Sequence, residues 1–270
     1  MLVYMSIPVI AVVNQKGGVG KTATTLGLAS AVAHSGRRCL VVDLDPQANA
    51  TASLNVDMSK GFTTDDVLAA DADGCAIDAV AETTWGAGVL AIPSNLALAS
   101  FEQDASLGSE QRLRKALKGV PEKLGVDLVL IDCPPSVGRL VSNGLVAATT
   151  TLVVTEAAAA SISGVENLIQ TVNVVREYYN PDLAIAGVVV NRMPTRQREA
   201  ASRLEELSKV LGSDLWEPVL PARAAVAEAM GNRVPFHSMA TGDNRVVADV
   251  YDIYLERLLG LTKPTLKAVN

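Results

Sequence analysis

The stretch Asn14-Gln15-Lys16-Gly17-Gly18-Val19-Gly20-Lys21-Thr22 joins an apolar β-branched run, Val9–Val13, to a segment with helical spacing, Lys21–Ser35. Glycines let backbone N–H groups turn inward around phosphate oxygens, and the N-terminus of the following helix adds positive potential. A lysine and a hydroxyl at the end of such a loop contact phosphates and Mg²⁺. Strand, loop and helix in this order therefore predict a phosphate-binding P-loop.

The residues of this loop have separate expected roles. Lys21 is predicted to reach the β- and γ-phosphates, and the Thr22 hydroxyl to bind Mg²⁺, while backbone groups of residues 17 to 20 surround the phosphates. The ordinary pattern has glycine five positions before Gly20, where this chain has Gln15, and an extra lysine, Lys16, opens the loop. The alternative, a glycine-rich turn that happens to contain lysines, is disfavoured by the flanking strand and helix.

Short β-branched runs alternate with helical patterns along the chain, and repeated alternation predicts an α/β, doubly wound, mostly parallel sheet flanked by helices. We expect a single domain over 1–270, with a core of about 7–260 and a tail at 261–270. Residues 55–86 are expected to form a mobile insertion with one short helix near Thr64–Ala70. The six predicted strands are Val9–Val13, Cys39–Leu44, Gly88–Ile92, Leu128–Ile131, Thr151–Val154 and Ile185–Val190.

Composition limits the function classes. The chain has 270 residues, 49% of them hydrophobic, and a net charge of −6, so any contact with nucleic acid must come from a local basic patch. Three widely spaced cysteines favour a reducing cytoplasm over a disulfide or metal framework. The apolar start lacks a basic leader, no run reaches the roughly 18 residues of a membrane span, and Met5 is an alternative start.

Acidic residues close two of the predicted strands. Asp43 and Asp45 end the second strand, and Asp132 ends the fourth, at the sheet edge where the P-loop lies. Hydrolysis of a bound triphosphate needs a metal and an oriented water, and we expect Asp132 to hold Mg²⁺ through water. Alone, each Asp could equally cap the next turn. Cys133 is predicted to be a packed residue without chemistry.

These motifs together resemble the ParA/Soj family of deviant Walker A ATPases. The resemblance also covers the segments Ile92–Ala99, Gly187–Arg192 and Leu220–Pro221, in family order. It implies ATP and Mg²⁺ as ligands, and a sandwich homodimer in which Lys16 of each subunit crosses to the phosphates of the other. It further implies that Asp45 orients the attacking water, that Asp43 supports the loop and the metal, and that Asn191 reads the adenine edge.

The family resemblance also implies an output. ATP-bound dimers of the family bind double-stranded DNA without sequence preference, and a centromere-binding ParB partner stimulates their weak hydrolysis and their release. A cytoplasmic, nucleoid-associated protein of plasmid or chromosome partition is therefore expected. The short segment before the first strand predicts no helix-turn-helix domain, so specific DNA recognition is expected in a partner.

The residues that contact DNA are harder to assign. Family members carry arginines soon after the proline equivalent to Pro221, where this chain has Ala222 and Ala225 with Arg223 between them. Arginines at or after the sixth strand are alternative phosphate contacts, although arginines interspersed with glutamates usually form surface pairs. The candidate DNA contacts are Arg192, Arg196, Arg198 and Arg223, with Arg203 as a further candidate.

Three other functions remain open at this point. A membrane-associated ATPase of the MinD kind shares the loop, but the apolar stripe of residues 247–258 has an acidic opposite face, which favours a helix packed on the core. A ParA-like protein that positions a protein assembly cannot be distinguished by sequence. A metabolic P-loop enzyme would need a second constellation of His, Cys or paired carboxylates, which the sequence does not display.

Overall fold

The strand that leads into the P-loop, β1 (Val9–Val13), lies inside the sheet, between β5 and β6. The computed structural model describes residues 7–159, 161–194 and 196–261, and within them the sheet has seven strands in the order β3-β4-β2-β5-β1-β6-β7. All neighbours run parallel except β3 and β4. The other strands are β2 (Cys39–Asp43), β3 (Ala81–Glu82), β4 (Val89–Ile92), β5 (Leu128–Asp132), β6 (Thr150–Glu156) and β7 (Ala184–Asn191).

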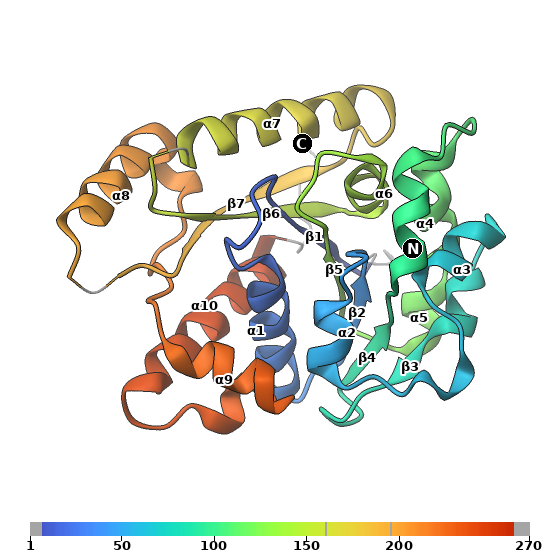
Figure 1. The fold of residues 1–270 in the computed structure, drawn as a ribbon, viewed down its shortest axis with the longest axis horizontal. Helices are drawn as coiled ribbons and strands as arrows, with labels where there is room; N and C mark the ends of the chain where they lie inside the picture. The colour runs from blue at the N-terminus through green and yellow to red at the C-terminus, as the bar shows by residue number, and fades with distance from the viewer. Residues whose placement is uncertain (1–6, 160, 195, 262–270) are drawn as a thin grey trace, which may run out of the picture.

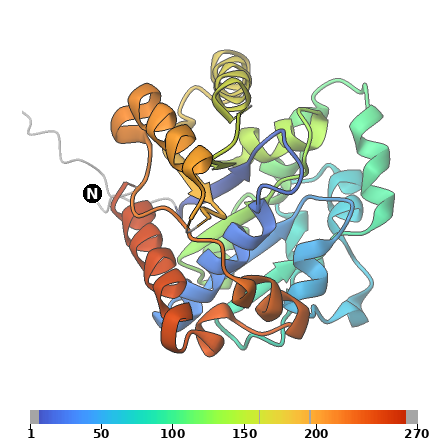
Figure 2. The same cartoon turned by 60° about the vertical axis from the view of Figure 1, so that its left-hand side comes forward.

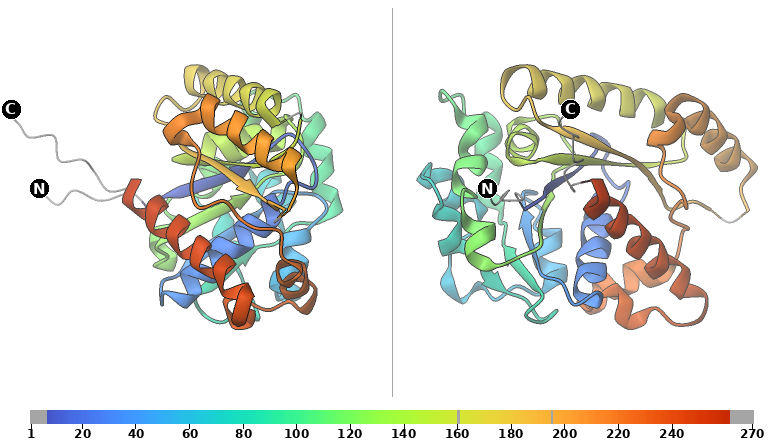
Figure 3. Two further views of the ribbon diagram at one scale, coloured as in Figure 1. Left: turned by 90° about the vertical axis from the view of Figure 1, so that its left-hand side faces the viewer. Right: turned by 180° about the vertical axis from the view of Figure 1, so that it is seen from behind.

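Helices cover both faces of this sheet (Figure 1). One face carries α1 (Lys21–His34), α2 (Asn49–Leu54), α9 (Ala224–Asn232) and α10 (Arg245–Leu261). The other face carries α3 (Thr64–Ala70), α4 (Arg112–Ala116), α5 (Val120–Leu124), α6 (Arg139–Ala147) and α7 (Ser161–Tyr178). The remaining helix, α8 (Arg198–Leu211), lies at the β7 edge, and α10 runs beside α1 (Figures 2 and 3). The predicted doubly wound fold is therefore confirmed.

Alternating side chains of the strands feed two separate cores, as expected for a sheet that is buried on both faces. Ile10 and Val12 of β1 point toward the α1 and α10 layer, whereas Ala11 and Val13 point toward the α6 and α7 layer. Helix α1 is buried along most of its length, and Gly27 leaves room there for the ring of Tyr251 from α10. The apolar face of α10 is thus packed on the core, as its sequence predicted.

The segment between α2 and β4, expected to be a mobile insertion with one short helix, contains more regular structure than the sequence predicted. Its helix, α3, has the predicted bounds, but the segment also contains 3₁₀ turns and the antiparallel strand β3. Val67 and Leu68 of α3 and Ala76 of the 3₁₀ turn after it are buried in the core on this face of the sheet. None of the helices in the described ranges has the length and apolar content to cross a membrane. The alternative start at Met5 and residues 262–270 of the predicted tail lie outside the described residues.

Candidate nucleotide-binding site

The P-loop wraps the N-terminus of α1 at the carboxyl edge of the sheet. Gly18 and Gly20 adopt left-handed backbone conformations with φ of 79° and 95°, which favour glycine and which the loop needs to turn its N–H groups inward. The cavity at this edge has a volume of about 280 Å³, and Lys21 and Thr22 form part of its wall. The lining residues are Gly18, Gly20, Lys21, Thr22, Ala23, Asp45, Gln47, Asn49, Pro135, Arg192 and Met230.

The side chain of Lys21 is held by a backbone carbonyl group of the P-loop itself. Its side chain is buried, and Nζ donates to the carbonyl oxygen of Lys16 at 3.3 Å. Burial lowers the pKa of Lys21 and the nearby Asp132 carboxylate partly offsets this shift. A buried ammonium group that faces a cavity is stabilised by an anion placed there, so the position of Lys21 suits a bound phosphate.

Two of the three predicted carboxylates lie side by side in the sheet. Asp43 and Asp132 are paired in register between β2 and β5, and both are buried. Burial is the main cause of a raised pKa for each; the charge of Asp43 adds to the shift of Asp132, and the charge of Asp45 adds to that of Asp43. One oxygen of Asp132, Oδ1, accepts from the Thr25 hydroxyl at 3.0 Å, whereas the buried Oδ2 accepts no hydrogen bond from the described residues. Buried carboxylate oxygens beside a phosphate cavity fit Mg²⁺, which prefers oxygen ligands.

The two acids at and just after the end of β2 have different surroundings. Asp45 lines the cavity, and its Oδ1 accepts from the backbone N–H of Gln47 at 2.9 Å. Asp43 accepts at Oδ2 from both the backbone N–H (2.8 Å) and the hydroxyl (2.7 Å) of Thr51, and at Oδ1 from the N–H of Asp45. Asp43 therefore fixes the segment that carries Asp45, and its contact with the metal stays a prediction.

Lys16 lies at the rim of the cavity and is not one of its lining residues. Its side chain is 57% exposed, and Nζ lies 3.5 Å from Oε2 of Glu156. Glu156 ends β6, and its other oxygen lies 3.6 Å from Nη1 of Arg192. Sequence reasoning missed Glu156; a carboxylate at the end of a strand next to the P-loop strand was the available signal.

Asn191 ends β7 beside the P-loop, and Arg192 follows it. The Asn191 amide donates to the carbonyl oxygens of Val19 (3.2 Å) and Gly20 (3.4 Å), so the side chain lies against the loop. Arg192 has a left-handed backbone (φ 54°), and its guanidinium donates to the carbonyl oxygen of Gly18. Asn191 thus supports the P-loop in this structure. The Arg192 side chain is exposed and also lines the nucleotide cavity.

The other candidate DNA contacts occupy one region. Arg196, just before α8, and Arg198, its first residue, are both exposed. The N–H of Ala222 donates to the carbonyl oxygen of Met193 at 2.9 Å, which brings the Arg223 segment beside the end of β7. Chain segments that are distant in sequence therefore bring these arginines to one side of the molecule. Arg203 instead pairs with Glu206 at 2.9 Å, as expected for a surface pair.

Comparisons with known proteins support this geometry. A family model described as "AAA domain" matches residues 7–185. The sporulation initiation inhibitor protein Soj of Bacillus subtilis is 34% identical over 84% of this chain and 89% of its own length. The chain belongs to the ParA/Soj family. The chromosome-partitioning ATPase Soj of Thermus thermophilus, another member, is 36% identical over 82% of this chain and 83% of its own.

Solved structures share the fold of this chain. A structure titled cobyrinic acid a,c-diamide synthase from Mycobacterium smegmatis, with bound ADP and magnesium, has a TM-score of 0.72 at 32% identity and covers 84% of this chain and 91% of that chain. A Cyanothece McdA complex with ATP has a TM-score of 0.82 at 19% identity, over 94% of this chain and 96% of that one, and shares the fold. As a ParA/Soj protein the chain is an ATP hydrolase that uses ATP with Mg²⁺.

Proposed function

We propose that this chain is an ATP-driven dimerisation switch that serves in plasmid or chromosome partition. ATP with Mg²⁺ joins two copies into a homodimer, the dimer binds double-stranded DNA without sequence preference, and a ParB-type partner stimulates hydrolysis and release. The observation that carries the proposal is the position of Lys16, which belongs to the P-loop yet is exposed at the rim of the cavity. A lysine placed there can reach the phosphates of a second copy once it leaves Glu156.

The residues of the cavity divide the chemistry between them. Lys21 and the backbone of residues 17 to 20 hold the phosphates, Thr22 and Asp132 hold Mg²⁺, and Asp43 supports both the metal and the segment that carries Asp45. Bound Mg²⁺ supplies positive charge that offsets the charge developing on the phosphate oxygens. Asp45, at the cavity wall, orients the attacking water. Lys16 of the second copy adds positive charge in trans, and Asn191 turns to the adenine edge.

DNA binding is assigned to the arginine-bearing side of the molecule. Arg196, Arg198 and Arg223 would contact phosphates, with Arg192 at the boundary between this side and the nucleotide cavity. The net charge of −6 means that one copy holds DNA weakly. Two such sides combined in a dimer double the number of phosphate contacts, so affinity rises with ATP and falls steeply with salt. The expected location is the cytoplasm, on the nucleoid, because the apolar face of α10 is occupied by the core.

An electrophoretic or fluorescence-anisotropy assay with plain duplex DNA tests the proposal. We expect ATP-loaded protein to bind DNA at low salt, ADP-loaded protein to bind far more weakly, and Lys16→Ala to lose the ATP-dependent gain. Lys123→Ala, which removes an exposed lysine from α5, is the matched control and should bind like the wild type. Binding that is independent of ATP, or equal binding by Lys16→Ala, contradicts the proposal.

A further inference from the structure

The loop Pro134–Gly138 contributes Pro135 to the wall of the nucleotide cavity. It connects β5, which ends at Asp132, to α6, and Pro135 lines the cavity. Pro134 and Pro135 have no N–H groups, so this part of the loop cannot be held by backbone donors. Both ends of the loop belong to packed elements, and a side-chain contact can set its position between them.

Glu102, the penultimate residue of the 3₁₀ segment η3 (Leu96–Gln103), supplies such a contact. The hydroxyl of Ser136 donates to Oε1 of Glu102 at 3.0 Å, and the N–H of Gly138 donates to the Ser136 hydroxyl at 3.4 Å. A Cβ atom added at Gly138 would lie 1.9 Å from Oε2 of Glu102, so the carboxylate rests directly on the backbone of the loop. Among the hydrogen bonds between described residues, this is the one that ties residues 134–138 to an element other than α6.

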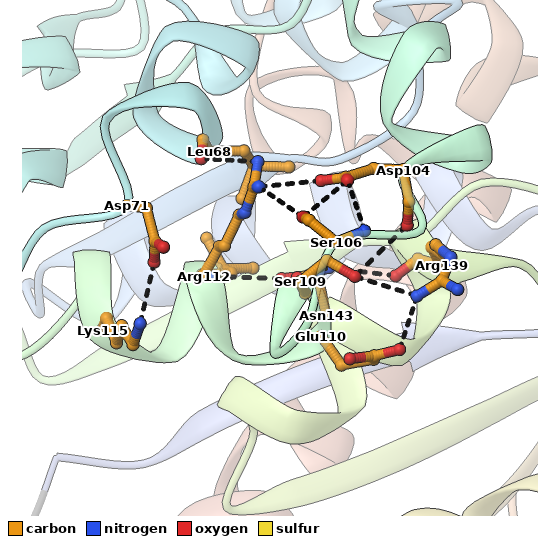
Figure 4. Close-up of polar contacts among 11 residues, drawn as sticks. Leu68, Asp71, Asp104, Ser106, Ser109, Glu110, Arg112, Lys115, Arg139 and Asn143 are labelled. Atoms are coloured by element: carbon orange, nitrogen blue, oxygen red, sulfur yellow. Dashed lines mark hydrogen bonds and ion pairs between the residues drawn. The ribbon is translucent and has the colours of Figure 1, made fainter.

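The segment that follows Glu102 is fastened to the start of α6 (Figure 4). Arg139 donates to the Ser109 hydroxyl at 2.8 Å and to Glu110 Oε1 at 2.6 Å. The amide of Asn143, one turn further along α6, donates to the carbonyl oxygen of Ser109 at 2.9 Å. Glu102 is therefore anchored to the helix that follows the loop.

A second set of contacts fixes the other end of this segment. Arg112 pairs with Asp104 at 2.9 Å, and its guanidinium lies 5.6 Å from the ring centroid of Phe101, the residue before Glu102. Ion pairs and cation–π contacts of this kind limit the movement of the backbone that carries Glu102. The Glu102 carboxylate is therefore held in a defined position beside the loop.

We propose that Glu102 is a positioning residue for ATP hydrolysis, which acts through Ser136 to hold the loop Pro134–Gly138 against the nucleotide site. Without this hydrogen bond the loop samples several positions between its fixed ends, and the wall beside Asp132 is in place for a smaller fraction of the time. A displacement of about 1 Å in a catalytic site can cost on the order of 100-fold in rate. The phosphate contacts of the P-loop and Lys21, which Glu102 does not touch, provide most of the ATP affinity, so the effect is expected mainly on kcat.

Single-turnover and steady-state ATPase assays with four variants test this role. We expect Glu102→Ala and Ser136→Ala each to lower kcat about tenfold, with KM and the affinity for a fluorescent ATP analogue within about twofold of wild type. The double variant should be no slower than either single variant, because both remove the same contact. Glu102→Gln keeps an acceptor for the Ser136 hydroxyl and should retain most of the activity.

Two further variants keep the test decisive. In Gly138→Ala the added methyl group would push the Glu102 carboxylate away from the loop. This variant should therefore show the same loss of kcat although it retains Glu102. Gln103→Ala, the exposed neighbour in η3, is the control and should match wild type. Additive losses in the double variant, a Glu102→Gln variant as slow as Glu102→Ala, or a loss explained by a lower melting temperature would overturn the proposal. DNA binding is not needed for any of these readouts, so a failure of the proposed partition function would be seen separately.

Discussion

Lys16 Nζ lies 3.5 Å from Oε2 of Glu156, a carboxylate of its own chain. To reach the phosphates of a second copy, Lys16 must leave this contact. We therefore expect Glu156→Gln to increase the dimer fraction at subsaturating ATP, by a fewfold at low salt, because an exposed ion pair contributes up to about 1 kcal/mol. Sedimentation velocity at several ATP concentrations measures the effect. An unchanged or smaller dimer fraction in Glu156→Gln would show that this contact does not oppose dimerisation.

Binding and hydrolysis should be separable within the cavity. Lys21→Ala removes a charged donor to the phosphates, which is worth about 1.5–3 kcal/mol, so ATP affinity should fall tenfold or more. Asp45→Asn leaves the phosphate contacts in place and should keep ATP affinity, while hydrolysis falls about 100-fold or more. Titration with a fluorescent ATP analogue and a phosphate-release assay distinguish the two. Normal hydrolysis by Asp45→Asn would exclude a role for this carboxylate in orienting water.

The arginines at the start of α8 should control the salt dependence of DNA binding. Each lost phosphate contact lowers the slope of log K against log salt by about 0.9. Arg196→Ala and Arg198→Ala should therefore weaken ATP-dependent binding and flatten this slope, equally for different duplex sequences. Arg176→Ala removes an exposed arginine from α7 and serves as the charge-matched control. Equal slopes for all three variants would place the DNA contacts elsewhere.

The buried His237 predicts a loss of stability in mild acid. Its ring contacts the Ser30 hydroxyl (2.7 Å) and Asp252 (3.1 Å), stacks on His34, and shares a small cavity with Arg245 and Asp249. Burial is the main cause of a lowered pKa for His237, and Asp252 partly opposes the shift.

Because His237 binds a proton less tightly in the folded state than in the unfolded state, its contribution to the free energy of unfolding is fully present above about pH 6.5. This contribution is lost as the pH falls below that value. We expect the melting temperature to drop between pH 7 and pH 5, and to drop less in His237→Gln, although that variant starts lower at pH 7. Parallel pH curves for the two proteins would assign the acid sensitivity to other groups.

Gly27 in α1 should not tolerate a side chain. A Cβ atom there would lie 2.2 Å from a ring atom of the buried Tyr251. The gain in helix propensity is about 1 kcal/mol, whereas overpacking of a filled core costs about 1–3 kcal/mol, and this approach is too close for partial relief. Gly27→Ala should therefore destabilise the protein in chemical denaturation. Gly164→Ala in α7, where a Cβ has open space, is the control and should stabilise it slightly.

Alternating strands and helices, and motifs whose residues are adjacent in the chain, could be predicted from the sequence. The P-loop strand, the helix after it and the acids after β2 and β5 were predicted because each motif is local. The contacts of Lys16 with Glu156 and of Ser136 with Glu102 join residues that are distant in the chain, so no local pattern revealed them. The strand β3 was missed because two residues give no usable alternation.

The site assignments show the same limit. The adenine contact of Asn191 stays a prediction; in this structure its amide donates to P-loop carbonyl oxygens, an orientation that depends on tertiary packing and that no local pattern reveals. Arg192 was grouped with the DNA contacts from its place in the sequence, and its left-handed backbone directs it to the P-loop and Glu156. Backbone conformations of single residues of this kind are not encoded by composition or periodicity.

Helix α1 is enclosed by the sheet on one side and by α10 on the other, with its residues buried from Lys21 to Val32 apart from Thr22. One side of the nucleotide site, the P-loop with α1, is therefore fixed by the core, whereas the loops opposite it are less constrained. The P-loop and α1 cannot shift without disturbing the core, so the phosphates are bound at a constant position. We therefore expect any change of shape on hydrolysis in the loops that face α1, and we expect the residues that restrain those loops to influence its rate.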